Sequence, residues 1–319
     1  MMLAAWLETD RGRIDVQGEE SKPRMHLSKN PNHQVEEGAF PTGTIVVDVY
    51  RAVISDFGYA LRISWAWILV AASALVAADL LLGEAFSSKA NRDAVADWSS
   101  FAVVLIYALP LASIAVAWHR WLLLKEKDPS RIYLRLDGTV LNYLGFAVLV
   151  QFIAWSPYIL PWLLRRFFKL IIEAVFGFSN DRVSAIEYVL SDQGLLASPI
   201  VQIFAFVAFL VFALRFGLVL PAKAIGLPGV SLKAAWQATR GQTFGLVVGL
   251  LLSVLPVVLA FVGLRLAGFD FSAEDGSVLH VSDRLMFVMF QTLLGLVQVA
   301  FLSYSFLFFF PPDNTPATT

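Results

Sequence analysis

Long apolar stretches separated by short polar links form the main pattern along this chain. Several stretches approach 20 residues, the length that an α-helix needs to cross the hydrocarbon core of a bilayer. Backbone polar groups must be satisfied internally in lipid, so such stretches favour helices. We therefore predict an all-α integral membrane protein with six transmembrane helices, near residues 64–82, 100–118, 139–163, 197–220, 242–264 and 286–310.

A helical period of three and four residues precedes the first predicted span. In residues 45–62 this period aligns Val49 and Val53 on one face. Asp48 and Arg51 fall on the opposite face, which is typical of an amphipathic helix. Because these residues lead directly into a span, we expect the helix to lie in the membrane interface. Packing on a cytosolic partner would produce the same pattern.

A second amphipathic interfacial helix is predicted between the fourth and fifth spans. Ser231 has the side chain of a good N-cap, and Gly241 is a suitable stop. Lys233 and Arg240 share the polar face, opposite Trp236. A basic amphipathic helix of this kind is expected to rest on anionic lipid headgroups, with the indole ring as its anchor.

The outer link 164–196 differs from the other links because its first half is apolar with charges on one side. We expect a helix that lies on the outer surface or dips into it, followed by a short helix near residues 184–190. Pro157 and Pro161 precede this link and are expected to kink or loosen the end of the third span.

The chain divides into three predicted regions. Residues 1–43 are charged and contain prolines and glycines, and they lack the apolar content that would offset the entropy of ordering. We expect them to be a disordered cytosolic tail, and Met25 is an alternative start of the chain. Residues 44–312 form the six-span membrane domain, and 313–319 a short C-terminal tail.

Composition supports the membrane assignment and limits the chemistry. Of the 319 residues, 58% are hydrophobic and 15% are charged, and the mean hydropathy is +0.68. Soluble domains are about a quarter charged. The net charge of −1 indicates no nucleic-acid partner. The chain has no cysteine, and its 4 histidines lack metal-ligand spacing. With no catalytic or phosphate-binding motif either, we expect neither a cofactor nor enzymatic activity.

Arg215 is the charge placed deepest in an apolar stretch. A charge within the membrane is costly and suggests a function, here contact with a phosphate or carboxylate. Snorkelling of the side chain to the cytosolic headgroups or a structural hydrogen bond is the simpler explanation. Arg120 ends the second span in register with Arg215, as in an ancient duplication or through a shared preference of span ends. The candidate anion or lipid-headgroup contacts are Arg215, Arg120, Lys233 and Arg240.

Small residues recur every four positions in the fifth span. Gly241, Gly245, Gly249 and Ser253 lie on one helical face. A smooth stripe of this kind allows close approach of another helix. The neighbour would be either another span of this chain or a second copy.

Two segments resemble a known group of proteins. These are AVAWHRWLLLKE at the end of the second span and LPGVSLKAAWQATRGQTFGLVVGLLL before and within the fifth. They resemble uncharacterised bacterial inner-membrane proteins that are similar to the membrane domain fused, in some bacteria, to glycerophosphodiester phosphodiesterase. The resemblance covers roughly residues 45–310 and implies six spans in the bacterial inner membrane. It carries no catalytic residue, because no soluble stretch here is long enough for a phosphodiesterase domain.

Orientation and function follow from the remaining patterns. Lysine and arginine near the span ends favour a cytosolic N-terminus and C-terminus, although Arg165, Arg166 and Lys169 run against this bias. We expect a non-enzymatic structural or accessory role in the envelope, with membrane lipids and a second copy or another membrane protein as partners. The alternative is a transporter or lipid-handling protein that uses Arg215.

Overall fold

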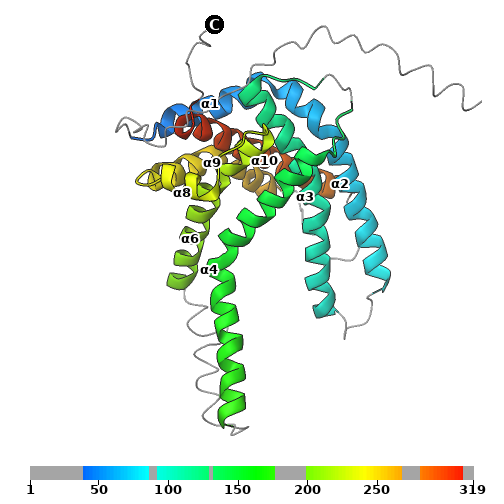
Figure 1. The fold of residues 1–319 in the computed structure, drawn as a ribbon. Coiled ribbons are helices and arrows are strands. Elements are labelled where there is room, and N and C mark those ends of the chain that lie inside the picture. Colours follow the sequence, from blue (N-terminus) through cyan, green and yellow to red (C-terminus); the bar gives the residue numbers. More distant parts are fainter. Residues whose placement is uncertain (1–38, 86–91, 129–131, 177–198, 268–280, 312–319) are drawn as a thin grey trace, which may run out of the picture. The chain divides into compact units, whose positions relative to one another are not determined.

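The protein is mainly helical in the part of the chain that the computed structural model describes, residues 39–85, 92–128, 132–176, 199–267 and 281–311. No strand occurs in these residues, which confirms the all-α class (Figure 1). The helices are α1 (Thr42–Ser55), α2 (Phe57–Ala85), α3 (Arg92–Leu124), α4 (Gly138–Phe176), α6 (Pro199–Gly217), α7 (Val219–Ala224), α8 (Leu232–Ala238), α9 (Thr243–Leu266) and α10 (Val281–Phe309).

Five apolar segments in the described residues are long enough to cross a membrane, as expected of a multi-pass protein. They correspond to the first, third, fourth, fifth and sixth predicted spans. The second predicted span, 100–118, falls in α3, whose described apolar part, Ala108–Leu124, is shorter. The five segments are Phe57–Ala77, Gly138–Leu160, Pro199–Ala224, Thr243–Leu266 and Leu285–Phe309.

The predicted helix 45–62 is in fact divided between α1 and α2. The helix is interrupted at Asp56, which follows the last residue of α1 and whose backbone N–H donates to the Ala52 carbonyl at 3.0 Å. Within α2 the predicted apolar face is only partly buried, because Ala60 is 1% exposed whereas Leu61 is 47% exposed. Val49 is buried within α1, whereas Phe57 in α2 is 55% exposed.

The start of the ordered core lies earlier than predicted. Phe40, which the sequence assigns to the tail, is 6% exposed. Its ring lies 5.4 Å from that of Phe308 and 5.7 Å from that of Phe309, centroid to centroid. Its backbone N–H donates to Gln242 Oε1 at 2.9 Å. The rest of the predicted tail, residues 1–38, lies outside the described residues.

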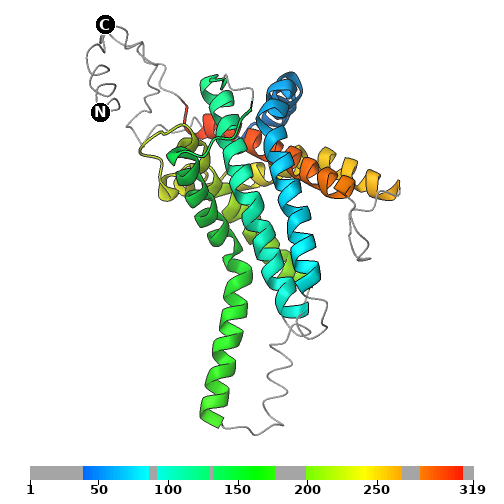
Figure 2. The same ribbon diagram turned by 90° about the vertical axis from the view of Figure 1, so that its right-hand side faces the viewer.

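Two groups of buried side chains join the helices. Near the middle of α2, Ile68, Ala71 and Leu75 pack against Val288 of α10, and α2 also runs beside α3 (Figure 2). A second group lies between α3, α4 and α7 and consists of Ala112, Ala115, Val116, Val140, Tyr143, Leu220 and Ala224.

The prediction of a separate surface helix after the third span is wrong for residues 165–176. These residues continue α4, which is one helix of 39 residues through both Pro157 and Pro161 (Figure 2). A proline removes one backbone donor, and the intact turns on either side preserve the helix. The second helix predicted near 184–190 lies outside the described residues.

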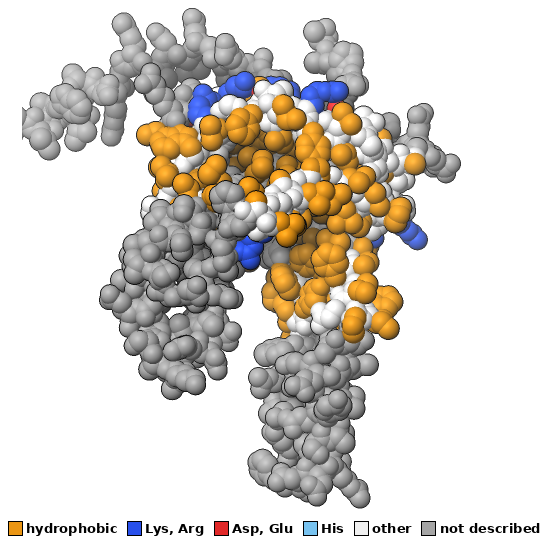
Figure 3. All heavy atoms as spheres, turned by 180° about the vertical axis from the view of Figure 1, so that it is seen from behind, with side chains coloured by type: hydrophobic (Ala, Val, Ile, Leu, Met, Phe, Trp, Pro, Cys, Tyr) orange, Lys and Arg blue, Asp and Glu red, His pale blue; other side chains and the backbone are white. Residues whose placement is uncertain are grey.

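The outer surface of the helices is strongly apolar. On the face drawn in Figure 3, hydrophobic side chains cover most of the surface that belongs to described residues. Large side chains in the membrane-spanning segments are turned outward, among them Phe152 of α4 and Phe204 of α6. A soluble protein rarely exposes a continuous apolar surface of this kind, whereas acyl chains would cover it in a bilayer.

Candidate functional site

Arg215 lies in the last turn of α6, and it is 8% exposed. Its Nε donates to Thr239 Oγ1 at 2.8 Å, and Nη2 donates to the Trp236 carbonyl. The guanidinium carbon lies 3.5 Å from the centre of the Trp236 ring. Such charge-assisted hydrogen bonds and cation–π contacts are strongest where water is excluded. Arg215 thus connects α6 to α8 and to the turn that follows it.

The local structure of α8 explains how it meets the arginine. Ser231 caps the helix as predicted, because its Oγ accepts from the Ala234 N–H at 3.1 Å. The buried Thr239 hydroxyl donates to the Ala235 carbonyl at 2.9 Å, which leaves its oxygen lone pairs to accept from Arg215. The Thr239 oxygen at the end of α8 is therefore available as an acceptor for the Arg215 guanidinium.

Trp236 is half-buried and packs on α6, and its role as a headgroup anchor stays a prediction. Its ring stacks on Phe216 at 5.1 Å and lies 5.9 Å from that of Phe212. Together with Arg215, these rings cover part of the indole. Lys233 and Arg240 are exposed, so they remain accessible to solvent or headgroups.

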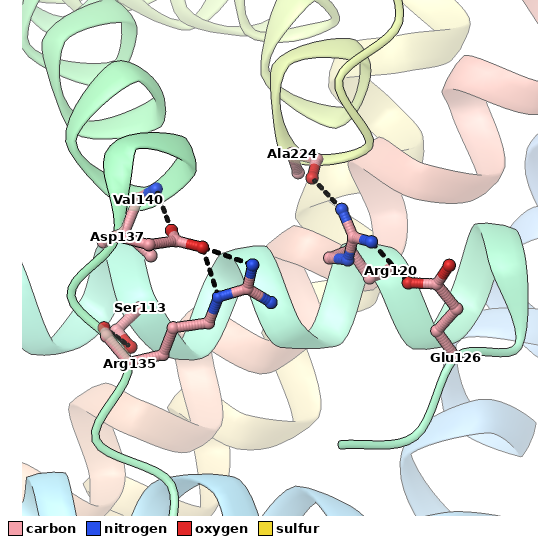
Figure 4. Close-up of polar contacts among 7 residues, drawn as sticks. All are labelled: Ser113, Arg120, Glu126, Arg135, Asp137, Val140 and Ala224. Atoms are coloured by element: carbon pink, nitrogen blue, oxygen red, sulfur yellow. Dashed lines mark hydrogen bonds and ion pairs between the residues drawn. The ribbon is translucent and has the colours of Figure 1, made fainter. Parts of the chain in front are cut away.

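Arg120 and Arg215, which are in register in the sequence, bind different partners. Arg120 Nη1 donates to the carbonyl of Ala224, the last residue of α7, at 3.4 Å (Figure 4). Its Nη2 donates to Glu126 at 2.5 Å. A cation at a helix C-terminus satisfies a free carbonyl and complements the helix dipole. The two arginines thus stabilise two separate helix ends.

The small-residue stripe of α9 packs against this same chain. A Cβ on Gly249 would lie 2.8 Å from Phe301 Cε2, and one on Gly245 would lie 3.1 Å from Phe40 Cβ. Thr42 Oγ1 donates to the Gly245 carbonyl at 3.3 Å. At these two positions the neighbours are α10 and the segment leading into α1, which answers the question left open by the sequence.

The ends of the stripe behave differently. Gly241 has φ +83°, a conformation that favours glycine, so it acts as the predicted stop after α8. A Cβ at this position would meet no atom within 4 Å, so Gly241 takes no part in packing. At the other end, Ser253 is buried and its carbonyl accepts from the Tyr50 hydroxyl of α1. The packing stripe is therefore Gly245, Gly249 and Ser253.

A buried polar group between α3, α4 and α10 was not predicted from the sequence. His119 of α3 is 0% exposed, and its Nδ1 lies 2.8 Å from Ser303 Oγ of α10. Its Nε2 lies 3.3 Å from the Tyr143 hydroxyl of α4. The sequence shows no serine positioned beside a histidine, since these two are 184 residues apart. The one signal was that each is a polar residue in a largely apolar stretch.

The hydrogen bonds of this group identify its protonation pattern. The Ser303 hydroxyl donates to the Val299 carbonyl at 2.9 Å, and a carbonyl can only accept. Nδ1 of His119 therefore carries the proton and donates to Ser303, while Nε2 accepts from Tyr143. A nucleophilic serine would instead give its proton to the histidine. The group serves to hold α3, α4 and α10 together.

The remaining described residues offer little further chemistry. Among them, no group of three or more His, Asp or Glu is arranged to hold a metal ion. Comparisons with protein-family models, curated proteins and solved structures found no match for this chain.

Proposed function

We propose that this chain is a multi-pass protein of the bacterial inner membrane with a non-enzymatic, structural or accessory role in the envelope. Both termini lie in the cytosol in this proposal. Its partners are membrane lipids and either a second copy or another membrane protein. The resemblance of residues 45–310 to the membrane domain associated with glycerophosphodiester phosphodiesterase supports the location.

The observation that carries the proposed role is the bonding of Arg215. An arginine that captures a substrate directs its donors toward an accessible space. Arg215 instead directs Nε and Nη2 at Thr239 and Trp236, and the indole covers its face. This supports a part in architecture, in which the cost of burying the charge is offset within the protein.

Native mass spectrometry of the protein released from lipid nanodiscs tests the role. The wild type is expected to retain a partner protein or a fixed number of copies. Arg215→Ala is expected to lower the melting temperature, because it leaves Thr239 and the Trp236 carbonyl without their donor. The control is Arg240→Ala, since Arg240 is exposed beyond the end of α8.

One outcome would overturn the proposed role in favour of transport or lipid handling. The wild type would retain a phospholipid or small anion, and Arg215→Ala would lose it while keeping its melting temperature. Loss of the same ligand in Arg240→Ala alone would point to the surface of α8 rather than to the buried arginine.

The orientation is tested by thiol labelling in intact cells, because the chain has no native cysteine. Lys233→Cys and Ser277→Cys place single thiols in links predicted to lie on opposite sides. A membrane-impermeant reagent is expected to label position 277 and not position 233. Labelling of position 233 from outside would reverse the orientation.

A further inference from the structure

The segment between α3 and α4 alternates between buried and exposed side chains. Tyr133 is 3% exposed, whereas Ile132, Leu134 and Leu136 are 55%, 48% and 53% exposed. These residues are not helical, and a two-residue alternation is typical of extended chain. We call residues 132–136 the return segment. One of its faces packs on the protein, and the other presents three large apolar side chains.

One hydrogen bond holds the return segment against α3, and a second joins its donor to α2. The Arg135 carbonyl accepts from Ser113 Oγ of α3 at 2.8 Å (Figure 4). Ser113 in turn accepts from Trp67 Nε1 of α2 at 3.2 Å. Both Ser113 and Trp67 are buried. The backbone of the segment is thus held by a side chain of α3 that is itself hydrogen-bonded to α2.

These hydrogen bonds locate the return segment along the helices. Ser113 precedes the last residue of α3, Leu124, by eleven positions, and Trp67 follows the first residue of α2, Phe57, by ten. At 1.5 Å per residue, each lies about 15 Å inside its helix. The chain that leaves α3 therefore runs back along α2 and α3. Trp67 lies three residues after the start of the predicted span 64–82, and Ser113 lies five residues before the end of the predicted span 100–118, so this level is near the edge of the hydrocarbon core.

The end of the return segment leads directly into a lipid-facing helix. Asp137 Oδ1 accepts from the Val140 N–H at 3.0 Å and caps α4, and Arg135 pairs with the same carboxylate (Figure 4). The apolar segment of α4 begins at the next residue, Gly138. Leu141, in its first turns, is 58% exposed. The apolar surface of Leu136 thus continues into that of α4.

We propose that the return segment lies in the bilayer interface, with Ile132, Leu134 and Leu136 inserted among the acyl chains beneath the headgroups. The partner of this surface is membrane lipid. Its depth along α2 and α3 and its continuity with α4 favour lipid over a soluble protein. The ion pair with Asp137 neutralises Arg135, which allows this charge to approach the hydrocarbon boundary. The proposal requires only that the chain spans a bilayer, so it does not depend on the accessory role.

Spin labelling tests this directly, because the chain has no native cysteine. Ile132→Cys, Leu134→Cys and Leu136→Cys carry a nitroxide in nanodiscs of phosphatidylethanolamine and phosphatidylglycerol. Glu126→Cys is the matched control, since Glu126 is exposed in the same link before the segment turns back. The collision rates of each nitroxide with oxygen, which concentrates in lipid, and with a water-soluble nickel chelate are compared.

The ratio of oxygen to nickel collisions is expected to be at least several-fold higher at positions 132, 134 and 136 than at 126. Equal nickel access at 134 and 126 would overturn the proposal, because it would put the segment in water. Low collision with both reagents at 134 would also overturn it, because a protein would then cover the surface. Distances between labels on different chains would identify that protein as a second copy. Each labelled variant is first shown to keep the wild-type melting temperature.

Discussion

At the scale of single residues, the distances between α9 and its neighbours show which of its small residues are needed for packing. Gly249→Ala puts a Cβ 2.8 Å from Cε2 of Phe301, whose ring is 0% exposed and has no room to move. Overpacking of this kind is expected to lower the free energy of unfolding by about 1–3 kcal/mol. Thermal unfolding in detergent measures it.

Gly263→Ala is the control in the same helix, because nothing lies within 4 Å of its Cβ position. Alanine favours a helix over glycine by up to about 1 kcal/mol, so this variant is expected to be unchanged or more stable. Equal destabilisation by both substitutions would show that α9 does not pack closely at Gly249.

At the scale of elements, the start of α4 depends on Asp137. Burial by itself raises the pKa of this carboxyl, but hydrogen bonds from the Val140 and Thr139 N–H groups and the pairing with Arg135 outweigh it, so the pKa is lowered. A carboxyl whose pKa is lowered by folding stabilises the folded state at pH values above its pKa in the unfolded chain, which is about 4. This stabilisation is lost as the pH falls through the pKa of the carboxyl in the folded state.

Asp137→Ala is therefore expected to lower stability at pH 7 by about 1 kcal/mol, the usual value of an N-cap. The difference from wild type should shrink as the pH falls below about 4, because the wild-type carboxyl becomes protonated there. Melting temperatures at pH 7 and pH 3 measure this. Asp48→Ala removes only the exposed pair with Arg51, and is expected to change little at either pH. A pH-independent difference at Asp137 would contradict the ion pair.

At the scale of the whole molecule, Phe40 joins the first described helix to the last. Its ring contacts Phe301, Phe308 and Phe309 of α10. Phe40→Ala is expected to cost about 3 kcal/mol, as for other buried phenylalanines, and to increase hydrogen exchange throughout α1. Phe57→Ala is the control, because Phe57 is 55% exposed. Unchanged exchange in α1 would show that Phe40 does not anchor it.

The predictions that succeeded depend on residues that are close together in the sequence. Five spans follow from length and hydropathy, and the Ser231 cap and the Gly241 turn follow from their neighbours in sequence. The predicted end of the third span at residue 163 was wrong, because the charges that begin the next link do not stop α4, which continues to Phe176. The break at Asp56 was missed because the apolar period runs unchanged across it.

The sequence by itself therefore determined the helical class, the lengths of five apolar helices that could cross a membrane, and the cap and stop of α8, since these depend on residues a few positions apart. Only the tertiary structure decided the partners: Trp236 and Thr239 for Arg215, Phe301 for Gly249, and Ser303 for His119. The physical reason is that lipid and protein interior are both apolar. A residue that faces a neighbouring helix and one that faces acyl chains then have the same hydropathy, so the pattern does not distinguish them.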